Sequence, residues 1–332
     1  MLYIAIYSLL TFFILFLSAK FGYYFNLIDK PNKRKIHSRP TAYTGGIAIS
    51  VILLLAIKFF DYSDNDLSII ISISFLVSCV GLIDDKYNLS VSNKLSLQII
   101  PIFFLVVIKF LKIEDLGYYY YFHTDLGAFE IPFTLICVLF LINAFNYFDG
   151  LDGSLSIVSL SVLLILIFLI PKQNFQLFLL LIILPNLIFL LFNFSLFNLP
   201  KLFLGDSGSL LLGFLISFIL IYLAKNNSTH PILLAWSVSI FVYEFLSINI
   251  IRLKNRQNLF APGKDHLHHL LFNRTKSLTI TNLILFVMNI IFFILGYLTF
   301  FILNPLASLI LFIFIFVIFI IFRNKYSNLK ID

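Results

Sequence analysis

Four short polar segments interrupt an otherwise apolar sequence, and each carries side chains that can bind cations or phosphates. They are GLIDDKYN (81–88), NAFNYFDGLDGS (143–154), KLFLGDSGS (201–209) and APGKDHLHHLL (261–271). Asp and Asn supply the hard oxygen ligands that suit Mg²⁺ or Mn²⁺, and protein-bound Mg²⁺ commonly meets a substrate phosphate. The segments therefore indicate a site for a hard cation and a phosphate group.

The second segment has the spacing of a helix end. Asn143, Asn146 and Asp149 are three residues apart, so they are expected on one helix face. Gly150 and Gly153 then break the helix and allow backbone N–H groups to approach a ligand closely.

The third segment is expected to place Asp206 just before a helix N-terminus, which is a favourable position for an anion. Ser207 and Ser209 are candidate caps, with Gly208 in the turn. An ordinary capped helix start explains this short stretch equally well.

The fourth segment contains His266, His268 and His269 beside Lys264. A zinc site is disfavoured because no Cys accompanies the three His residues, which stand on one short stretch. Their N–H donors could instead contact a diphosphate, although solvated loop residues are the simpler alternative.

The elements that carry these segments must be membrane helices. The chain has 332 residues, of which 61% are hydrophobic and 12% charged, and its mean hydropathy is +1.02. That composition predicts an all-α, polytopic integral membrane protein and excludes a β-barrel, because the apolar runs do not alternate. The first run lacks the features of a cleavable signal peptide and is expected to be a span. Cys79 and Cys137 lie in apolar runs and predict neither a disulfide nor a metal site.

Eleven apolar runs are about long enough to cross a bilayer of ~30 Å. They cover residues 2–19, 45–60, 67–83, 95–111, 131–147, 154–170, 175–192, 208–224, 232–251, 279–301 and 306–322. Together they predict a single transmembrane domain over residues 1–332.

The distribution of Lys and Arg predicts the orientation of this domain. With the N-terminus outside, 18 of the 23 basic residues fall in inward-facing loops, which makes the C-terminus cytoplasmic. The predicted cytoplasmic loops are about 20–44, 84–94, 148–154, 193–207 and 252–278. The net charge of +7 is thus explained by topology, and no nucleic-acid partner is indicated.

With this orientation, all four polar segments emerge on the cytoplasmic side. Five acidic residues stand there within a few residues of a span end, where anionic lipid would favour cations instead. They are Asp84, Asp85, Asp149, Asp152 and Asp206. Their accumulation on one side predicts a compensating metal ion.

The motifs, taken together, resemble a known family. DKPNKRKIHSRPTAYTGG (29–46), GLIDDKYNLS (81–90), NAFNYFDGLDG (143–153), FLGDSGS (203–209) and HLHH (266–269) are similar, in order, to those of polyprenyl-phosphate N-acetylhexosamine-1-phosphate transferases. This is glycosyltransferase family 4, and the resemblance is to the branch that initiates O-antigen, enterobacterial common antigen or teichoic acid linkage units.

The resemblance implies a reaction in the bacterial cytoplasmic membrane, with the active site facing the cytoplasm. Polyprenyl (undecaprenyl) phosphate attacks the β-phosphorus of a UDP-amino sugar, UMP leaves, and a polyprenyl-diphospho-sugar remains. The expected cofactor is Mg²⁺, with Mn²⁺ as a substitute, and a homodimer is possible. The amino sugar is left open.

The resemblance also assigns roles to individual residues. Asn146 and Asp206 resemble the metal ligands, and Asp84, Asp85 and Asp149 the catalytic acids. The nucleotide-sugar contacts are expected at Asp152, Phe203, Asn88, His266, His268 and His269. Further candidates are Asn143, Lys33, His37, Arg39, Glu244 and Lys264.

Two positions depart from the family pattern. Asn88 stands where many relatives have an acid, and Glu244 takes the place of an Asp within the ninth span. An intramembrane carboxylate is a functional candidate, and pairing between helices is an equally good explanation of Glu244.

Two other classes of protein are alternatives to a transferase. An ion-coupled transporter also uses polar residues in broken helices, but its site lies near the bilayer midplane and its chain often shows repeats. Here the acids gather at one surface and no repeat is visible. A non-catalytic scaffold would not need the Asp and Asn clusters.

Overall fold

The computed structural model describes residues 2–31, 39–60, 62, 64–257, 263 and 265–328. Its helices are α1 (Leu2–Tyr24), α2 (Gly45–Phe59), α3 (Asn65–Tyr87), α4 (Val91–Phe103), α5 (Glu130–Phe148), α6 (Ser154–Leu169), α7 (Gln173–Asn193), α8 (Gly205–Lys225), α9 (Pro231–Ser237), α10 (Ser239–Lys254), α11 (Leu267–Thr275), α12 (Leu278–Ile302) and α13 (Pro305–Asn328). Two antiparallel ribbons pair β1 (Ile28–Asp29) with β2 (Thr41–Ala42), and β3 (Asp115–Tyr118) with β4 (His123–Asp125).

The long helices confirm the predicted all-α, polytopic class of membrane protein. Within the described residues, eight helices are long and apolar enough to span a bilayer, and α9 with α10 would make a ninth despite a bend of 74°. The apolar helices α2 and α6 are shorter. Each of the eleven predicted spans overlaps one of these elements, while the number that cross the membrane stays a prediction.

Local sequence signals explain several helix ends. The Asp64 side chain accepts a hydrogen bond from the Leu67 amide and so caps α3, and Ser90 caps α4 in the same way through Asn93. Asn88 ends α3 with φ 50°, in the left-handed conformation that Asn tolerates well. Pro101 lies inside α4, and the helix continues into a π-helical turn over Phe104–Ile108.

Helix α8 is packed on several sides, because α2, α3 and α5 contact it. Glycines permit the two closest approaches. A Cβ atom on Gly46 of α2 would lie 2.0 Å from the Gly208 amide nitrogen, and one on Gly81 of α3 would lie 2.4 Å from the Asp206 carbonyl oxygen. Small residues at such contacts let membrane helices pack backbone to backbone.

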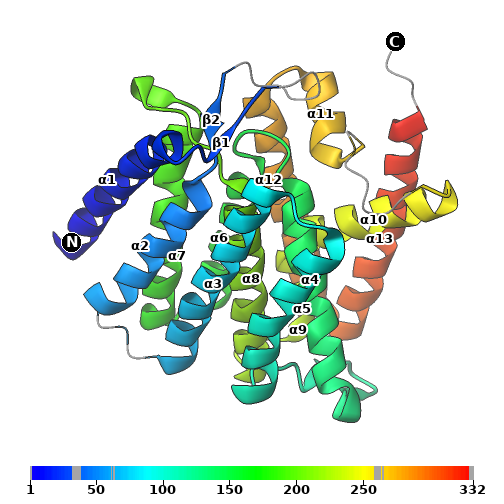
Figure 1. Ribbon diagram of the computed structural model, residues 1–332. Helices are drawn as coiled ribbons and strands as arrows, with labels where there is room; N and C mark the ends of the chain where they lie inside the picture. Colours follow the sequence, from blue (N-terminus) through cyan, green and yellow to red (C-terminus); the bar gives the residue numbers. More distant parts are fainter. Residues whose placement is uncertain are drawn as a thin grey trace.

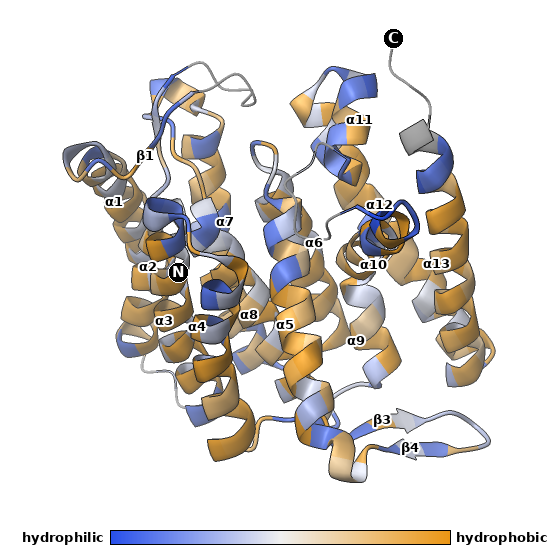
Figure 2. Ribbon diagram, turned by 45° about the vertical axis from the view of Figure 1, so that its right-hand side comes forward, coloured by the Kyte–Doolittle hydropathy of each residue, from blue (hydrophilic) through white to orange (hydrophobic). Residues whose placement is uncertain are grey.

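The connections divide between the two ends of the helices (Figure 1). The β1–β2 ribbon, the turn between α5 and α6, and α11 lie at the upper end, whereas the β3–β4 hairpin lies at the lower end (Figure 2). Apolar residues colour the helices between these two ends (Figure 2). The described parts of the loops predicted to be cytoplasmic thus share one end of the molecule.

One local prediction was wrong. Asp206 does not precede its helix but lies in the first turn of α8, which begins at Gly205. Ser207 and Ser209 are inside the helix, and Gly208 is a packing position against Gly46 and not a turn residue. Helix α8 starts at Gly205 because this residue, at φ +71°, adopts the left-handed backbone conformation that turns the chain into the helix.

Candidate active site

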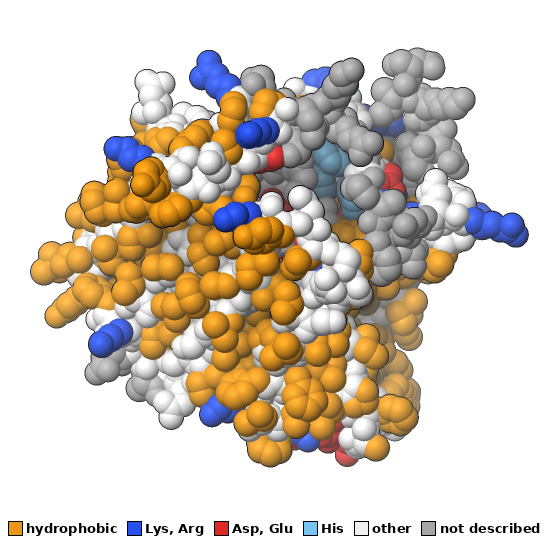
Figure 3. Space-filling model, in the orientation of Figure 1, with side chains coloured by type: hydrophobic (Ala, Val, Ile, Leu, Met, Phe, Trp, Pro, Cys, Tyr) orange, Lys and Arg blue, Asp and Glu red, His pale blue; other side chains and the backbone are white. Residues whose placement is uncertain are grey.

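A cleft of about 1160 Å³ opens at the upper end and gathers most of the predicted site residues. Its walls include Asp84, Asp85, Asn88, Asp149, Asp152, Phe203, Asp206 and His269. Figure 3 shows acidic and His side chains recessed near this end, above a surface of hydrophobic side chains. The cleft is therefore polar and lies at one end of the helices, away from the midplane where a transporter site would be expected.

An ion-pair cluster holds two of the carboxylates that line the cleft. The Lys94 Nζ atom lies 2.7 Å from Asp84 Oδ2 and 2.5 Å from Asp206 Oδ2. Asn146 donates through Nδ2 to Asp206 Oδ1 at 2.9 Å and to Ser209 Oγ at 2.8 Å. Side chains from α3, α4, α5 and α8 thus meet at the Asp206 carboxylate.

Backbone pairing holds Asp206 in place. The Phe203 amide donates to the Ala42 carbonyl at 2.8 Å, and the amides of Gly45 and Gly46 donate to the carbonyls of Phe203 and Leu204. This short ladder ties the segment before α8 to the start of α2. The Ser207 amide in the first turn of α8 also donates to Asp85 Oδ2 at 3.4 Å, so the helix N-terminus faces a carboxylate.

Asp149 ends α5 beside this cluster. Its carboxyl keeps some contact with solvent through the cleft, yet protein surrounds it on the other sides. Burial, followed by the negative charges of Asp206 and Asp152, raises the pKa of Asp149 to about 8. Asp149 is therefore a weaker acid than an exposed Asp side chain, chiefly because it is buried.

The predicted nucleoside contacts form a second group. Lys201 Nζ donates to Asp152 Oδ2 at 2.6 Å and lies 5.3 Å from the centre of the Phe203 ring. Asn282 of α12 donates to the Asp152 carbonyl at 2.9 Å and so anchors the turn after α5. Asp152 and Phe203, far apart in sequence, therefore face one part of the cleft.

The three predicted His residues have different surroundings. Of these, His269 lines the cleft. His268 is fully buried against Gly150, where a Cβ atom would lie 2.1 Å from His268 Nε2. Burial, followed by the charges of His269, His266 and Arg323, holds the pKa of His268 well below its usual range. His266 is buried beside Glu244.

Several other predicted residues do not line the cleft. Asn143 donates to the Leu139 carbonyl of its own helix, so it does not act with Asn146. Glu244 pairs with Arg323 of α13, which supports the explanation that it joins helices. Arg39 is exposed and is not among the cleft-lining residues. Lys33, His37 and Lys264 lie outside the described residues.

Sequence reasoning missed two site residues, Lys94 and Lys201. Lys94 is in the first turn of α4, where the helix dipole disfavours a cation. A Lys at this unfavourable position is the one sequence feature that indicates a nearby carboxylate partner. Lys201 stands two residues before Phe203, at the start of the third polar segment, where its charge alone gives no sign of a pairing with Asp152.

The oxygen-bearing side chains set limits on a metal site. Among the described residues, no group of three or more His, Cys, Asp or Glu side chains is arranged to hold a metal ion alone. Asp206 and Asn146 are in contact and could each present one oxygen. Two protein ligands, completed by water and substrate phosphates, are typical of Mg²⁺.

The fold and the cleft define a polytopic membrane protein with a carboxylate-rich site at one end, and comparison with known proteins is consistent with this class. The sequence profile described as glycosyl transferase family 4 matches residues 67–224, which include Asp84, Asn146 and Asp206. A probable undecaprenyl-phosphate N-acetylglucosaminyl 1-phosphate transferase of Bacillus subtilis (strain 168) is 30% identical over 274 residues, which cover 80% of this chain and 75% of the relative.

Two further relatives are named undecaprenyl-phosphate alpha-N-acetylglucosaminyl 1-phosphate transferase. The protein of Salmonella typhi is 28% identical over 274 residues, covering 80% of this chain and 74% of its own. That of Escherichia coli (strain K12) is 27% identical over 270 residues, covering 79% and 74%. The chain therefore belongs to glycosyl transferase family 4, the polyprenyl-phosphate N-acetylhexosamine-1-phosphate transferases that its motifs resemble.

Proposed function

We propose that the protein transfers an N-acetylhexosamine 1-phosphate from a UDP-sugar to undecaprenyl phosphate. The names of its relatives support N-acetylglucosamine as the first sugar to test. The observation that carries the proposal is the cluster in which Lys94 and Asn146 hold Asp84 and Asp206, two carboxylates that line the polar cleft. Such a cluster at a membrane surface suits a lipid phosphate that meets a water-soluble sugar nucleotide.

In the proposed reaction, an oxygen of the lipid phosphate attacks the β-phosphorus of the UDP-sugar. The bond from that phosphorus to the oxygen bridging the two phosphates breaks, and UMP leaves with the electron pair. Asp84 would accept a proton from the fraction of lipid phosphate that is still monoprotonated, since the second phosphate pKa is about 6. Lys94 holds Asp84 and Asp206 at a fixed separation around the reacting groups.

Mg²⁺ is the proposed cofactor, and the residues present fit it. Asp206 and Asn146 would hold the ion together with substrate oxygens. The bound ion would offset phosphate charge that builds up in the transition state.

The remaining residues would bind the donor. Phe203 offers a ring for the uracil to stack on, and Asp152 offers an acceptor for its N–H group. His269, which lines the cleft beside the buried His268, would contact the diphosphate. The proposed location is the bacterial cytoplasmic membrane, with the cleft open to the cytoplasm where UDP-sugars are made.

The test uses the purified protein in detergent with undecaprenyl phosphate, Mg²⁺ and a panel of UDP-amino sugars. Mass spectrometry should find a lipid-diphospho-sugar for at least one donor, with one UMP released per lipid product. Omission of the lipid phosphate should abolish UMP release. Absence of a lipid product with every donor would contradict the proposal.

A further inference from the structure

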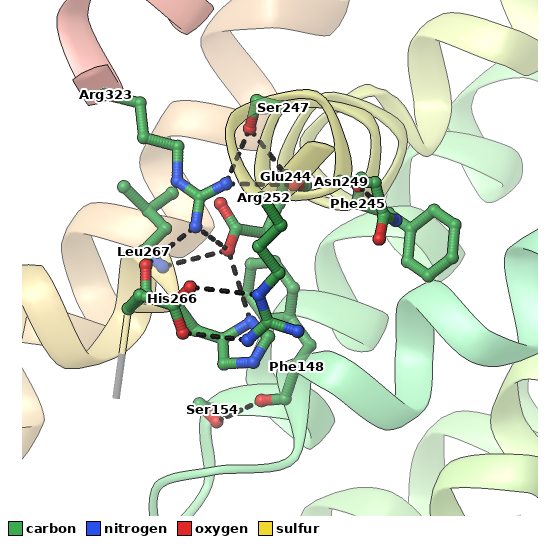
Figure 4. A network of polar contacts seen from close by, with 11 residues as sticks. Phe148, Ser154, Glu244, Phe245, Ser247, Asn249, Arg252, His266, Leu267 and Arg323 are labelled. Carbon is green, nitrogen blue, oxygen red and sulfur yellow. Dashed lines mark hydrogen bonds and ion pairs between the residues drawn. The ribbon is translucent and has the colours of Figure 1, made fainter. Parts of the chain in front are cut away.

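A buried ion pair joins α10 to α13 (Figure 4). Glu244 Oε1 lies 3.1 Å from Arg323 Nη2, and the two side chains are only 1% and 2% exposed. Arg323 Nη1 also donates to Ser247 Oγ at 2.8 Å and to the Glu244 carbonyl at 3.3 Å. The guanidinium is thus fixed against α10 by several bonds.

The same two side chains also bind the backbone just before α11. The Leu267 amide donates to Glu244 Oε1 at 3.0 Å, and Arg323 Nη2 donates to the Asp265 carbonyl at 2.7 Å. Arg252 of α10 adds a bidentate pair to the Asp265 carboxylate, at 3.1 and 2.9 Å (Figure 4). Two membrane helices therefore converge on one short stretch of chain.

This stretch carries the His residues. His266 Nδ1 lies 3.5 Å from Glu244 Oε1, and His268 packs against Gly150 in the turn that follows α5. His269, one residue further along the first turn of α11, lines the cleft. Because the backbone is held at Asp265 and Leu267, the position of His269 depends on the ion pair behind it.

We propose that Glu244 and Arg323 are positioning residues for the transferase site, through which the last helix fixes the presentation of His269 to the cleft. This inference rests on the proposed function for its catalytic part. Arg323 acts from α13, which contributes no residue to the cleft lining among the described residues.

A purely stabilising role would not need this arrangement. A buried ion pair adds little net stability over an apolar pair of similar size. Here, however, both partners direct hydrogen bonds to the backbone of residues 265–267, which an apolar pair could not replace. The test must therefore separate folding from the placement of α11.

The decisive variant is the double substitution Glu244→Leu with Arg323→Met, which leaves neither buried charge unpaired. Arg323→Met alone and Arg323→Lys complete the series. Lys325→Met is the matched control, because it removes an exposed cation from the same helix. Each full-length protein is purified in detergent and compared by thermal unfolding, by hydrogen exchange and by steady-state kinetics with the UDP-sugar.

We expect the double variant to fold, while amide exchange over residues 265–275 rises by about tenfold or more. Its kcat should fall by roughly ten- to a hundredfold, as expected when a group near the reaction is misplaced by about 1 Å. Its KM for the UDP-sugar should rise by a smaller factor than kcat falls, because the displaced His269 loses its diphosphate contact while the nucleoside contacts remain. Arg323→Lys should recover part of kcat, and Lys325→Met should match the wild type.

A folded double variant with wild-type exchange over residues 265–275, or with kcat close to that of the wild type, would overturn the inference. Failure of the proposed function gives a different result. In that case the wild type itself releases no UMP, while the exchange measurement still reports whether Glu244 and Arg323 hold α11.

Discussion

Lys94 shows how much of the site depends on a single side chain. Its ammonium group lies between the carboxylates of Asp84 and Asp206, which come from two different helices. Without it, two carboxylates would face each other with less compensation in a partly buried setting. The lysine therefore sets the geometry in which a metal ion and a phosphate could bind.

Substitution of Lys94 by Gln should leave an inserted protein with little activity. The loss of the cation removes electrostatic organisation at the site, and kcat should fall by about a hundredfold or more. UMP release measured at saturating substrates gives the value. Lys58→Gln removes an exposed cation in the last turn of α2. It is the control and should keep the wild-type kcat. Equal activity of the two variants would contradict the role of Lys94.

Substitution of Phe203 by Ala should act on donor binding. Stacking on a base contributes about 1–3 kcal/mol, so KM for the UDP-sugar should rise roughly tenfold or somewhat more. Phe203→Tyr retains a ring and should change the KM for the UDP-sugar only slightly. Phe129→Ala removes an exposed ring at the other end of the molecule and should have no effect. An unchanged KM in Phe203→Ala would show that the ring does not stack on the base.

Residue types and spacing predicted much of this site, but not its full membership. Asp84, Asp206 and Asn146 are brought together as expected, because each lies in the first or last turn of its helix at the same end of the molecule. Asn143 has the right helical spacing but bonds to its own backbone instead. His268 was expected at the ligand, yet it fills space against Gly150. Spacing along a chain does not reveal which neighbour packs on a side chain.

At the level of elements, contacts with α8 determine where the acids lie. Its first turn carries Asp206, and glycines on α2 and α3 bring those helices to within backbone contact of it. The carboxylate is therefore positioned by close helix packing as well as by the Lys94 ion pair. Any residue that separates the helices should displace Asp206.

Gly46→Val should destabilise the protein and lower its activity. A side chain there would overlap the Gly208 backbone, and overpacking of this kind costs about 1–3 kcal/mol. The midpoint of thermal unfolding in detergent should fall measurably. Ala5→Val, at an exposed position of α1, also creates a β-branched side chain but on an exposed surface, and it should leave the midpoint unchanged. Equal midpoints would show that the α2–α8 contact can relax freely.

The sequence predicted the elements better than their details. Every apolar run became a helix or a bent pair, because burial of the backbone in lipid leaves few alternatives. The 74° bend between α9 and α10 was not predicted, since neither Gly nor Pro marks residue Val238 where the helix breaks. The β1–β2 ribbon and α11 were also missed, because short elements in polar loops depend on tertiary contacts.

At the level of the whole molecule, the separation of the two ends is the main feature. The acidic cleft lies at one end and the β3–β4 hairpin at the other (Figures 1 and 2). The arrangement agrees with the alternation of loops that the Lys and Arg count predicted. Which end faces the cytoplasm stays a prediction, and it can be tested directly.

Tyr121→Cys in the hairpin and Phe197→Cys at the cleft end place thiols at highly exposed positions, 79% and 86% exposed. A membrane-impermeant maleimide should label Tyr121→Cys in intact spheroplasts. It should label Phe197→Cys only after the membrane is opened. The unsubstituted protein measures the background from Cys79 and Cys137. The reverse labelling pattern would place the cleft outside and remove its access to UDP-sugars.

The central claim is that Asp206 helps to hold a divalent metal ion at which sugar 1-phosphate is transferred. The most direct measurement is kcat for UMP release by Asp206→Ala, beside wild type with Mg²⁺ and with EDTA. Since a metal ion contributes several kcal/mol to such a transition state, kcat should fall at least about a thousandfold while the protein still inserts and folds. EDTA should abolish UMP release by the wild type, and added Mg²⁺ or Mn²⁺ should restore this activity. Full wild-type activity in EDTA, or an Asp206→Ala enzyme within about tenfold of wild type, would contradict the account.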